Sequence, residues 1–374
     1  MSDGNAAPVR VASIVRVLIV DDSAYVRKMV TQMLSRSPFV DVIGTARDGK
    51  EALEMTALLK PDVITCDLNM PEMDGVAFVR AQMAKRPVPI VIISVANPSG
   101  EEVLAALEAG AVDFLQKPTA LATDRLLDVA DELVAKVKAA GGAQLWRVPP
   151  AVVRTADKAP ASGVSARLTD ILLIGISTGG PQALKILIPQ LPADFPIPVA
   201  MVLHMPVGYT ELYAKKLDEL SHVKVKEPFE GEVIEAGTAY LAPAGRHLSF
   251  RRAGARVVAH LDVRPLDTPH RPAVDVMFQS AADIYGARVM GVVMTGMGAD
   301  GRDGASWIKA RGGQVITEAE QSCVVYGMPR EAISRGGAGY VASLLRMPGL
   351  IADCFTKLQA AKPRRAGSHA RLGH

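Results

Sequence analysis

Residues 171–180, Ile-Leu-Leu-Ile-Gly-Ile-Ser-Thr-Gly-Gly, begin as a buried strand and end in a glycine-rich turn. Five of the first six residues are apolar, and the β-branched side chains among them favour a strand. Pro181 then stands near the start of a segment with helical spacing. Ser177 is therefore expected at a tight turn that leads from a strand into a helix.

Such a turn can present Ser177 as a nucleophile. Glycines on both sides let the backbone approach closely, and the free N–H groups and dipole of the helix favour negative charge developing nearby. Residues 175–179 also fit the pattern G-x-S-x-G. A glycine-rich turn after a strand can equally bind a phosphate or simply reverse the chain, so this stretch alone leaves the alternatives open.

The length and composition of the chain limit its class. A chain of 374 residues is too long for one ordinary core, so two domains are expected, and 49% hydrophobic residues support globular ones. The net charge of +3 does not indicate nucleic acid or a membrane surface as partner. Cys66, Cys323 and Cys354 are far apart, which favours reduced thiols over a disulfide or metal site. The sequence has neither a long apolar run nor a signal-peptide pattern, so a soluble cytoplasmic protein is expected.

The N-terminal half alternates short apolar strands with helical segments. The strands are expected at residues 15–20, 41–45, 63–66, 90–95 and 113–115. Five such repeats predict an α/β domain with a parallel sheet, helices on both faces and the flavodoxin-like strand order. Functional groups of such a sheet gather at the carboxyl ends of its strands.

Acidic side chains follow the ends of two of these strands. Asp21 and Asp22 follow the first strand, and Asp67 ends the third. The two strands are neighbours in the flavodoxin-like order, so the three carboxylates would converge at one edge of the sheet. Mg²⁺ is the expected occupant, because a hard divalent cation neutralises such a cluster with oxygen ligands. Each acid taken singly could instead be a helix N-cap or a turn residue.

The same edge carries the groups that phosphoryl transfer requires. A carboxylate oxygen of Asp67 could attack a phosphoryl donor. Lys117 follows the fifth strand, and its ammonium group, together with Mg²⁺, would offset the charge of the transferring group. Ser94 lies near the end of the fourth strand and belongs to the same set.

These residues lie in motifs that resemble the response-regulator receiver domain. The motifs are Val20-Asp21-Asp22-Ser23, Asp67-Leu68-Asn69-Met70-Pro71-Glu72-Met73-Asp74-Gly75, Ser94 and Phe114-Leu115-Gln116-Lys117-Pro118. The resemblance implies Mg²⁺ held by Asp21 or Asp22, Asp67 and the Asn69 carbonyl. It also implies phosphorylation of Asp67 by a sensor histidine kinase, with Lys117 contacting the phosphoryl group. Ser94 and Phe114 would be the switch pair, where the family often has Thr and Tyr.

The segment that follows predicts a domain boundary. We expect the receiver domain at residues 14–140, closed by an amphipathic helix over residues 124–138. Residues 141–167 lack a sustained period and contain Pro149-Pro150 and Ala159-Pro160, which indicates a connector. Trp146 in this connector could dock on a domain or bind a partner. The second domain is expected at residues 168–360, followed by a solvated basic tail at residues 361–374.

A nucleophilic Ser177 needs a base, and two histidines are suitably placed. His204 ends the strand at residues 199–203, so it also falls at a strand terminus. His270 stands in Thr268-Pro269-His270-Arg271-Pro272, before a helix that begins near Val274. A histidine at the end of a neighbouring parallel strand is placed where a base would have to be. The others lie in the tail or lack a surrounding motif: His222, His247, His260, His369 and His374.

The acid that would orient the imidazole is Asp300. It stands in a glycine-rich turn, residues 295–301, after another buried strand at residues 288–294. An aspartate before a glycine at a helix start is also an ordinary N-cap. The chain order Ser177, His204, Asp300 differs from the order Ser, acid, His of the α/β-hydrolase fold, so the G-x-S-x-G match does not indicate that fold.

Six separated motifs of the C-terminal half resemble the CheB-type protein-glutamate methylesterase domain. The resemblance implies a doubly wound α/β fold with Ser177, His204 and Asp300 as the triad and no cofactor. Thr178 and the backbone N–H of Met297 would lie near the oxyanion, and His270 would be a substrate-side or structural residue. Ile176 replaces the usual Ala. The motifs are Gly175-Ile176-Ser177-Thr178-Gly179-Gly180-Pro181, His204-Met205-Pro206, Tyr240-Leu241-Ala242-Pro243, His270-Arg271-Pro272-Ala273-Val274-Asp275, Thr295-Gly296-Met297-Gly298-Ala299-Asp300-Gly301 and Tyr326-Gly327-Met328-Pro329.

The two resemblances together imply a regulated enzyme. It would hydrolyse glutamate methyl esters on chemoreceptors, release methanol and also deamidate receptor glutamines. The unphosphorylated receiver would cover the active-site cleft, and phosphorylation of Asp67 would loosen that contact. A signalling protein whose second domain binds a partner without catalysis is the rival hypothesis, and a methylesterase that serves a non-chemotactic signalling array is a third.

Overall fold

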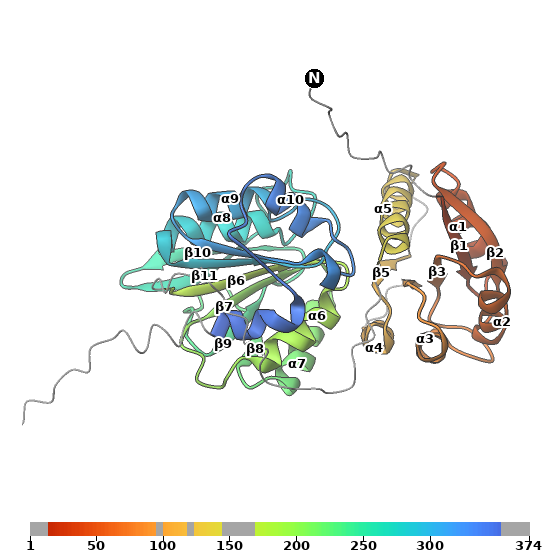
Figure 1. The fold of residues 1–374 in the computed structure, drawn as a ribbon, viewed down its shortest axis with the longest axis horizontal. Helices are drawn as coiled ribbons and strands as arrows, with labels where there is room; N and C mark the ends of the chain where they lie inside the picture. Colours follow the sequence, from red (N-terminus) through yellow and green to blue (C-terminus); the bar gives the residue numbers. More distant parts are fainter. Residues whose placement is uncertain (1–13, 95–99, 118–122, 144–168, 353–374) are drawn as a thin grey trace, which may run out of the picture.

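The structure is a computed structural model, and it describes residues 14–94, 100–117, 123–143 and 169–352 (Figure 1). Figure 1 shows two α/β bodies side by side, each built around one large parallel sheet. Val95, Trp146 and Cys354 lie outside the described residues, as do the predicted connector after residue 143 and the basic tail.

The N-terminal body has the predicted flavodoxin-like sheet. Its five strands run in the order β2-β1-β3-β4-β5, and all of their pairings are parallel. Every residue of β3 and β4 is buried, as continuous apolar runs in a two-sided sheet require. The strands are β1 (Val15–Val20), β2 (Val40–Ala46), β3 (Val63–Cys66), β4 (Ile90–Ser94) and β5 (Asp113–Gln116).

The helices of this body alternate with its strands. They begin where side chains cap them: Ser23, Asp48 and Asp74 each accept backbone N–H groups at a helix start. None of the three predicted metal-ligating aspartates serves as one of these caps. The closing helix runs to Gly141 rather than ending near residue 138. The helices are α1 (Ala24–Leu34), α2 (Gly49–Leu59), α3 (Gly75–Lys85), α4 (Glu101–Ala109) and α5 (Thr123–Gly141).

The C-terminal body has a seven-stranded parallel sheet in the order β14-β13-β12-β6-β7-β9-β8. A separate antiparallel hairpin joins β10 (His247–Ala253) and β11 (Arg256–Asp262). The sheet strands are β6 (Ile171–Ile176), β7 (Val199–Leu203), β8 (Lys224–Lys226), β9 (Thr238–Leu241), β12 (Val289–Val293), β13 (Gln314–Glu318) and β14 (Tyr340–Ala342). The helices are α6 (Gly180–Leu187), α7 (Thr210–Leu220), α8 (Val274–Tyr285), α9 (Arg302–Ala310) and α10 (Met328–Ser334).

Residues 171–176, which form β6, lie at the centre of this second sheet. All six residues of β6 are buried, and β6 lies between β7, the next strand in sequence, and β12, a much later one. The strand order therefore reverses at β6. In open α/β sheets, the crevice at the carboxyl ends of the strands beside such a reversal is where ligands bind. The residues that follow β6, β7 and β12 are thus brought together.

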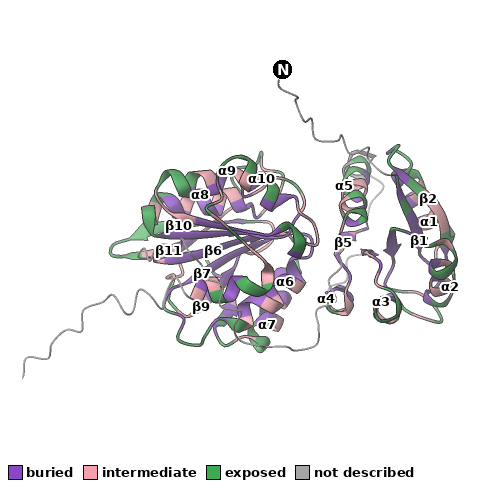
Figure 2. Ribbon diagram, viewed as in Figure 1, coloured by how far each residue is buried: buried purple, intermediate pink, exposed green. Residues whose placement is uncertain are grey.

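The two bodies share part of one hydrophobic core. Figure 2 shows the central strands of both sheets as buried. One cluster of buried apolar side chains includes Leu104 and Leu107 of α4, and it continues through Leu184 of α6 and Tyr213 of α7. The α4 face of the first body is therefore packed against the second. Within the described residues, no helix is long and apolar enough to cross a bilayer.

Candidate functional site

Ser177 is the first residue after β6, at the predicted turn. Its backbone N–H donates to the carbonyl of Thr295 across the neighbouring strand end, at 3.0 Å. Gly179 has a φ of 79°, which a residue with a side chain rarely adopts, and α6 begins at the next residue. The backbone N–H groups of Thr178 and Met297 donate to no residue that the structure describes. Within the described residues, the turns after β6 and β12 thus each hold one backbone donor without an acceptor.

His204 and Asp300 are in contact, as predicted from the strand ends. His204 follows β7, and its Nε2 lies 2.8 Å from Oδ2 of Asp300. The other ring nitrogen, Nδ1, is buried and has no partner among the described residues. Within the same residues, the Ser177 hydroxyl makes no hydrogen bond. The imidazole therefore has one nitrogen engaged by the acid and one available.

The Asp300 carboxylate is held in place by backbone donors. Its Oδ2 accepts the N–H of Val274 at 2.7 Å, and its Oδ1 accepts the N–H of Asp275 at 2.9 Å. Asp300 therefore caps the start of α8 instead of its own following helix, α9. Burial raises the pKa of Asp300, but the hydrogen bond and charge of His204 and the two N–H donors outweigh it and hold the pKa below its usual value. Asp300 is thus an ionised partner for the imidazole.

His270 lies against the imidazole of His204. The two ring centroids are 4.0 Å apart and the rings are stacked at 24°. Burial and the neighbouring His204 lower the pKa of His270 to about 4. His270 is therefore uncharged at neutral pH and covers one face of the His204 ring.

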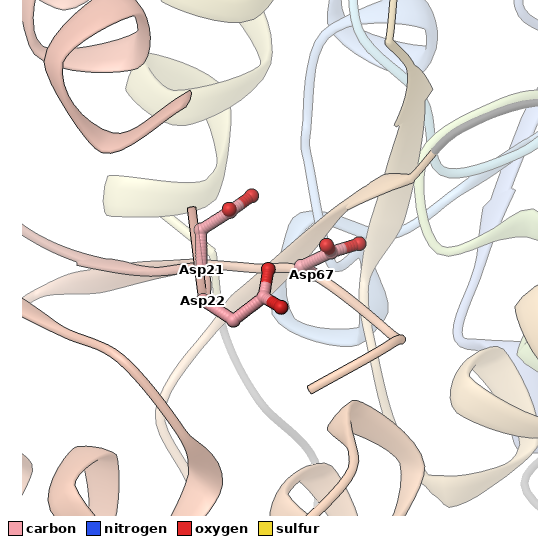
Figure 3. Close-up of side chains that lie close together, drawn as sticks. All are labelled: Asp21, Asp22 and Asp67. Atoms are coloured by element: carbon pink, nitrogen blue, oxygen red, sulfur yellow. The ribbon is translucent and has the colours of Figure 1, made fainter. Parts of the chain in front are cut away.

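The three predicted metal-ligating aspartates lie together at the ends of β1 and β3 (Figure 3). One oxygen from each of Asp21, Asp22 and Asp67 lies within 4.8 Å of the others. Lys117 Nζ lies 2.7 Å from Asp21 Oδ2 and 2.8 Å from Asp67 Oδ2. Burial, opposed by Lys117, raises the pKa of Asp21. The fourth predicted ligand, Asn69, is exposed on the loop after β3.

The predicted switch residues occupy the neighbouring strands. Ser94 is buried at the end of β4, and its carbonyl accepts the N–H of Lys117 at 2.7 Å. Phe114 of β5 packs edge-on against Tyr209 of the second body, with ring centroids 5.0 Å apart. The predicted aromatic switch therefore contacts the other domain directly.

The start of β5 touches the turn that carries Ser177. The carbonyl of Val112 accepts the N–H of Gly179 at 3.0 Å. The Thr178 hydroxyl donates to Oδ2 of Asp113 at 2.5 Å, and the partly buried Lys136 donates to Oδ1 of the same carboxylate at 2.8 Å. The two residues that follow Ser177 are thus bound by the first domain.

Helix α4 extends this contact along α6 and α7. Glu108 lies 2.7 Å from Lys185 and 3.6 Å from Lys216, so one carboxylate faces two ammonium groups. Gln182 donates a side-chain hydrogen bond to the carbonyl of Leu107. A small apolar pocket between Leu104, Leu107, Pro181 and Tyr213 lies beside these contacts. The N-terminal part of α6 is therefore covered by the first domain.

Asp113 and Glu318 are residues of these sites that were not predicted from the sequence. Asp113 opens β5, at the opposite end of the strand from the carboxyl end where functional groups are expected. Glu318 closes β13 and is fully buried, so the rule that found Asp67 could have found it.

Comparisons with known proteins identify both domains. The CheB methylesterase family matches residues 172–351, and the response regulator receiver domain matches residues 17–130. Protein-glutamate methylesterase/protein-glutamine glutaminase 5 of Myxococcus xanthus is 46% identical over 91% of this chain and 98% of the relative. A protein-glutamate methylesterase/protein-glutamine glutaminase of Halalkalibacterium halodurans is 42% identical over 92% of this chain and 98% of the relative.

A solved structure matches the second domain. The crystal structure of the Thermotoga maritima CheB methylesterase catalytic domain is 41% identical, and the match covers 50% of this chain and 99% of that one, with a TM-score of 0.49. The extent of the curated matches decides the family, because each spans nearly the whole length of both proteins. The chain therefore belongs to the family of protein-glutamate methylesterases/protein-glutamine glutaminases, with a response-regulator receiver domain ahead of a CheB methylesterase domain.

Proposed function

We propose that this protein hydrolyses glutamate methyl esters on chemoreceptors from the cytoplasm, with methanol as the product, and that it also deamidates receptor glutamines. The observation that carries the proposal is the contact of His204 Nε2 with the ionised Asp300 beside a serine at the reversal of the strand order. The names of the relatives supply the substrate class. Acyl transfer is the reaction that a serine, an imidazole and a carboxylate support.

The proposed chemistry uses the free nitrogen of His204. Asp300 accepts the Nε2–H and so fixes the tautomer in which Nδ1 is the base. His204 Nδ1 takes the proton of Ser177 as the serine oxygen attacks the ester carbonyl. The protonated imidazole then gives that proton to the leaving methoxide, which departs as methanol. Water, deprotonated by the same nitrogen, cleaves the acyl-enzyme to release the glutamate carboxylate and Ser177.

Two backbone donors would stabilise the charge that develops on the carbonyl oxygen. The N–H groups of Thr178 and Met297 have no acceptor among the described residues, and they belong to the two turns that the bond from the Ser177 N–H to the Thr295 carbonyl joins. The start of α6 adds its dipole. Each such donor typically lowers the barrier by about 3 kcal/mol. The uncharged His270 would cover the imidazole without competing for its proton.

The receiver domain would accept a phosphoryl group from a sensor histidine kinase on Asp67. The carboxylates of Asp21, Asp22 and Asp67 fit a hard divalent cation, because three acidic oxygens lie close together with one ammonium group to offset them. Mg²⁺ bound there would neutralise the charge of the phosphoryl group during transfer. Lys117 already reaches Asp67 and would contact the transferred group.

The receiver contacts around Ser177 support regulation by autoinhibition. Val112 and Asp113 bind Gly179 and Thr178, so in this arrangement they occupy groups beside the nucleophile. Phosphorylation of Asp67 would act through Ser94 and Phe114, the switch pair, and Phe114 would then leave Tyr209. The phosphoryl group would thereby favour an arrangement in which the turn is open to substrate.

Methanol release tests the proposed function directly. Membranes that carry methylated chemoreceptors are incubated with the protein, with and without a small-molecule phosphodonor and Mg²⁺. We expect methanol release that rises by about tenfold or more when the donor is present, because domain opening shifts the population of active molecules. Membranes whose receptors were never methylated are the control. Absence of release from methylated membranes under every condition would contradict the proposal, and release from a different methylated array would favour a non-chemotactic role.

Charge reversal at Glu108 is expected to activate the unphosphorylated protein. A lysine at this exposed position would face Lys185 and Lys216, and like charges across an interface are repulsive. We expect Glu108→Lys to raise the donor-free rate of methanol release by about tenfold, which corresponds to about 1.4 kcal/mol of lost contact. The effect should weaken at high salt.

Two variants control this experiment. Glu54→Lys makes the same change at an exposed position on α2, which lies on the side of the first body away from the second (Figure 1), and should leave the donor-free rate unchanged. Lys185→Glu combined with Glu108→Lys restores one opposite-charge pair and should return the rate toward the wild-type value. A folded Glu108→Lys protein with the wild-type donor-free rate would argue against autoinhibition through this face.

A further inference from the structure

Glu318, the last residue of β13, is a buried carboxyl group that the proposed chemistry does not use. Its side chain has no exposed surface. Oε2 accepts the backbone N–H of Thr295 at 2.9 Å, and Oε1 accepts the hydroxyl of Ser322 at 2.9 Å. Glu318 forms no salt bridge within the described part of the chain, and burial raises the pKa of Glu318 to about 7. Such a group is costly to bury, so its place in the core calls for a physical reason.

Thr295 connects Glu318 to the nucleophile turn. Its carbonyl accepts the N–H of Ser177 at 3.0 Å. Its hydroxyl donates to the carbonyl of Thr178 at 3.0 Å and accepts the N–H of Val325 at 3.0 Å. The remaining polar group of Thr295 is its backbone N–H, which donates to Oε2 of Glu318. A single residue thus joins Glu318 to the backbone on both sides of the Ser177 side chain.

The same residue also begins the loop that carries Met297. Gly296 follows Thr295, and it is fixed by its N–H to Val325 and by its carbonyl, which accepts the N–H groups of Gly327 and Met328. The space at Gly296 is tight, because an added Cβ would lie 2.9 Å from the Cβ of Ser177. The position of Thr295 therefore sets the distance between the serine and the Met297 donor.

We propose that Glu318 is a positioning residue of the esterase site. Glu318 holds Thr295 in place, and Thr295 in turn holds the backbone of Ser177 and Thr178 and the loop that carries Met297. The inference rests on the proposed function for the identity of the reaction. It assigns no contact with substrate to Glu318. The hydrogen bond that matters is the one accepted from the Thr295 N–H, so an uncharged acceptor of the same shape should serve as well as a carboxylate.

Three substitutions separate positioning from general stability. Glu318→Gln keeps one oxygen to accept the Thr295 N–H, while its amide group can donate to Ser322. Glu318→Leu has a similar size and no acceptor. Thr317→Val is the matched control, because Thr317 is the buried neighbour on the same strand and its hydroxyl donates to Tyr340, away from Ser177. Thermal unfolding of each variant reports its folded fraction.

Two readouts are measured on the folded, donor-activated full-length proteins. The first is kcat and KM for methanol release from methylated receptor membranes. The second is the rate at which a fluorophosphonate labels Ser177, which needs an activated serine but no receptor. We expect Glu318→Leu to lower kcat and the labelling rate by about tenfold to 100-fold with KM within about threefold of wild type, because small displacements of reacting groups cost rate in this range. Glu318→Gln and Thr317→Val should both stay within about threefold of wild type.

The outcomes distinguish this proposal from the proposed function. The positioning role of Glu318 would be overturned if a folded Glu318→Leu protein kept wild-type labelling and kcat. It would also be overturned if Glu318→Gln were as impaired as Glu318→Leu, or if the wild type were not labelled at Ser177. Labelling that depends on Glu318 without any methanol release would keep the positioning role and reject the receptor ester. If Glu318→Leu does not fold, Ser322→Ala removes the donor to Oε1, together with the contacts of the same hydroxyl with the Ala319 carbonyl and the Leu344 N–H. It should lower the labelling rate by more than the roughly threefold allowed for Thr317→Val, whereas an unchanged rate would contradict the proposal.

Discussion

Replacing Ser177 by alanine is expected to lower kcat for methanol release by about six orders of magnitude, so that the remaining activity is close to the background rate. The hydroxyl is the atom that would form the acyl-enzyme, and no other serine or cysteine among the described residues follows β6, β7 or β12, where the free donors lie. The fold should be retained, because Ser177 holds its neighbours through its backbone N–H to Thr295 and not through its hydroxyl.

Ser334→Ala is the matched control for this loss. Ser334 is exposed at the end of α10, and its hydroxyl donates to the carbonyl of Glu331. We expect its rate to stay within about twofold of wild type, as for surface substitutions in general. A Ser177→Ala protein that still releases methanol at the wild-type rate would refute the serine mechanism. Receptor binding without methanol release by the wild type would favour the rival hypothesis of a partner-binding domain.

Replacing Asp300 by asparagine is expected to lower kcat by about four orders of magnitude. Asparagine has one oxygen, whereas the carboxylate accepts His204 Nε2, Val274 N–H and Asp275 N–H with two. If the amide NH₂ faces the imidazole, Nε2 must accept, and the proton moves to Nδ1, which then cannot take the proton of Ser177. The variant should also lose about 1–3 kcal/mol of stability, because a backbone donor at the start of α8 is left unsatisfied.

The pH dependence of unfolding checks that Asp300 is ionised. Its pKa lies below the usual value in the folded state, so its contribution to stability is present above about pH 4 and is lost as the pH falls through the folded pKa. Wild type should therefore lose more stability than Asp300→Asn between about pH 5 and pH 3. If Asp300→Asn lost stability at acid pH as wild type does, or kept the wild-type kcat, Asp300 would not be the residue that orients the imidazole.

Much of the fold followed from local patterns in the sequence. Short apolar strands that alternate with helices gave the order β2-β1-β3-β4-β5, because a parallel sheet with crossover helices has few ways to connect. The rule that functional groups follow the carboxyl ends of parallel strands brought together Asp21, Asp22 and Asp67, and separately His204 and Asp300. Periodicity locates the strands, and the connection rules for parallel sheets limit which of them can be neighbours.

The remaining features depend on contacts that no local pattern encodes. Asp300 precedes α9, and sequence spacing suggested that it could cap that helix, whereas it caps α8 through Val274 and Asp275. Asp113 stands at the start of a strand, and its contact with Thr178 requires the two domains to be docked. Glu318 accepts the N–H of Thr295, and this contact requires a side chain at the end of β13 to reach across to the backbone that follows β12. Such long-range pairings are fixed by packing in three dimensions.

The contact of Val112 and Asp113 with the turn after Ser177 has a consequence for the affinity of the substrate. Under the proposed regulation, the receiver is a competitor tethered to its own target, and groups joined in one chain meet at an effective concentration on the order of millimolar. A receptor segment present at about 1 μM would therefore lose the competition even if it bound the turn many times more tightly. An interface too weak to join two separate molecules would still keep the intact chain closed, so the loss of a few contacts, such as Phe114 on Tyr209, would suffice to open it.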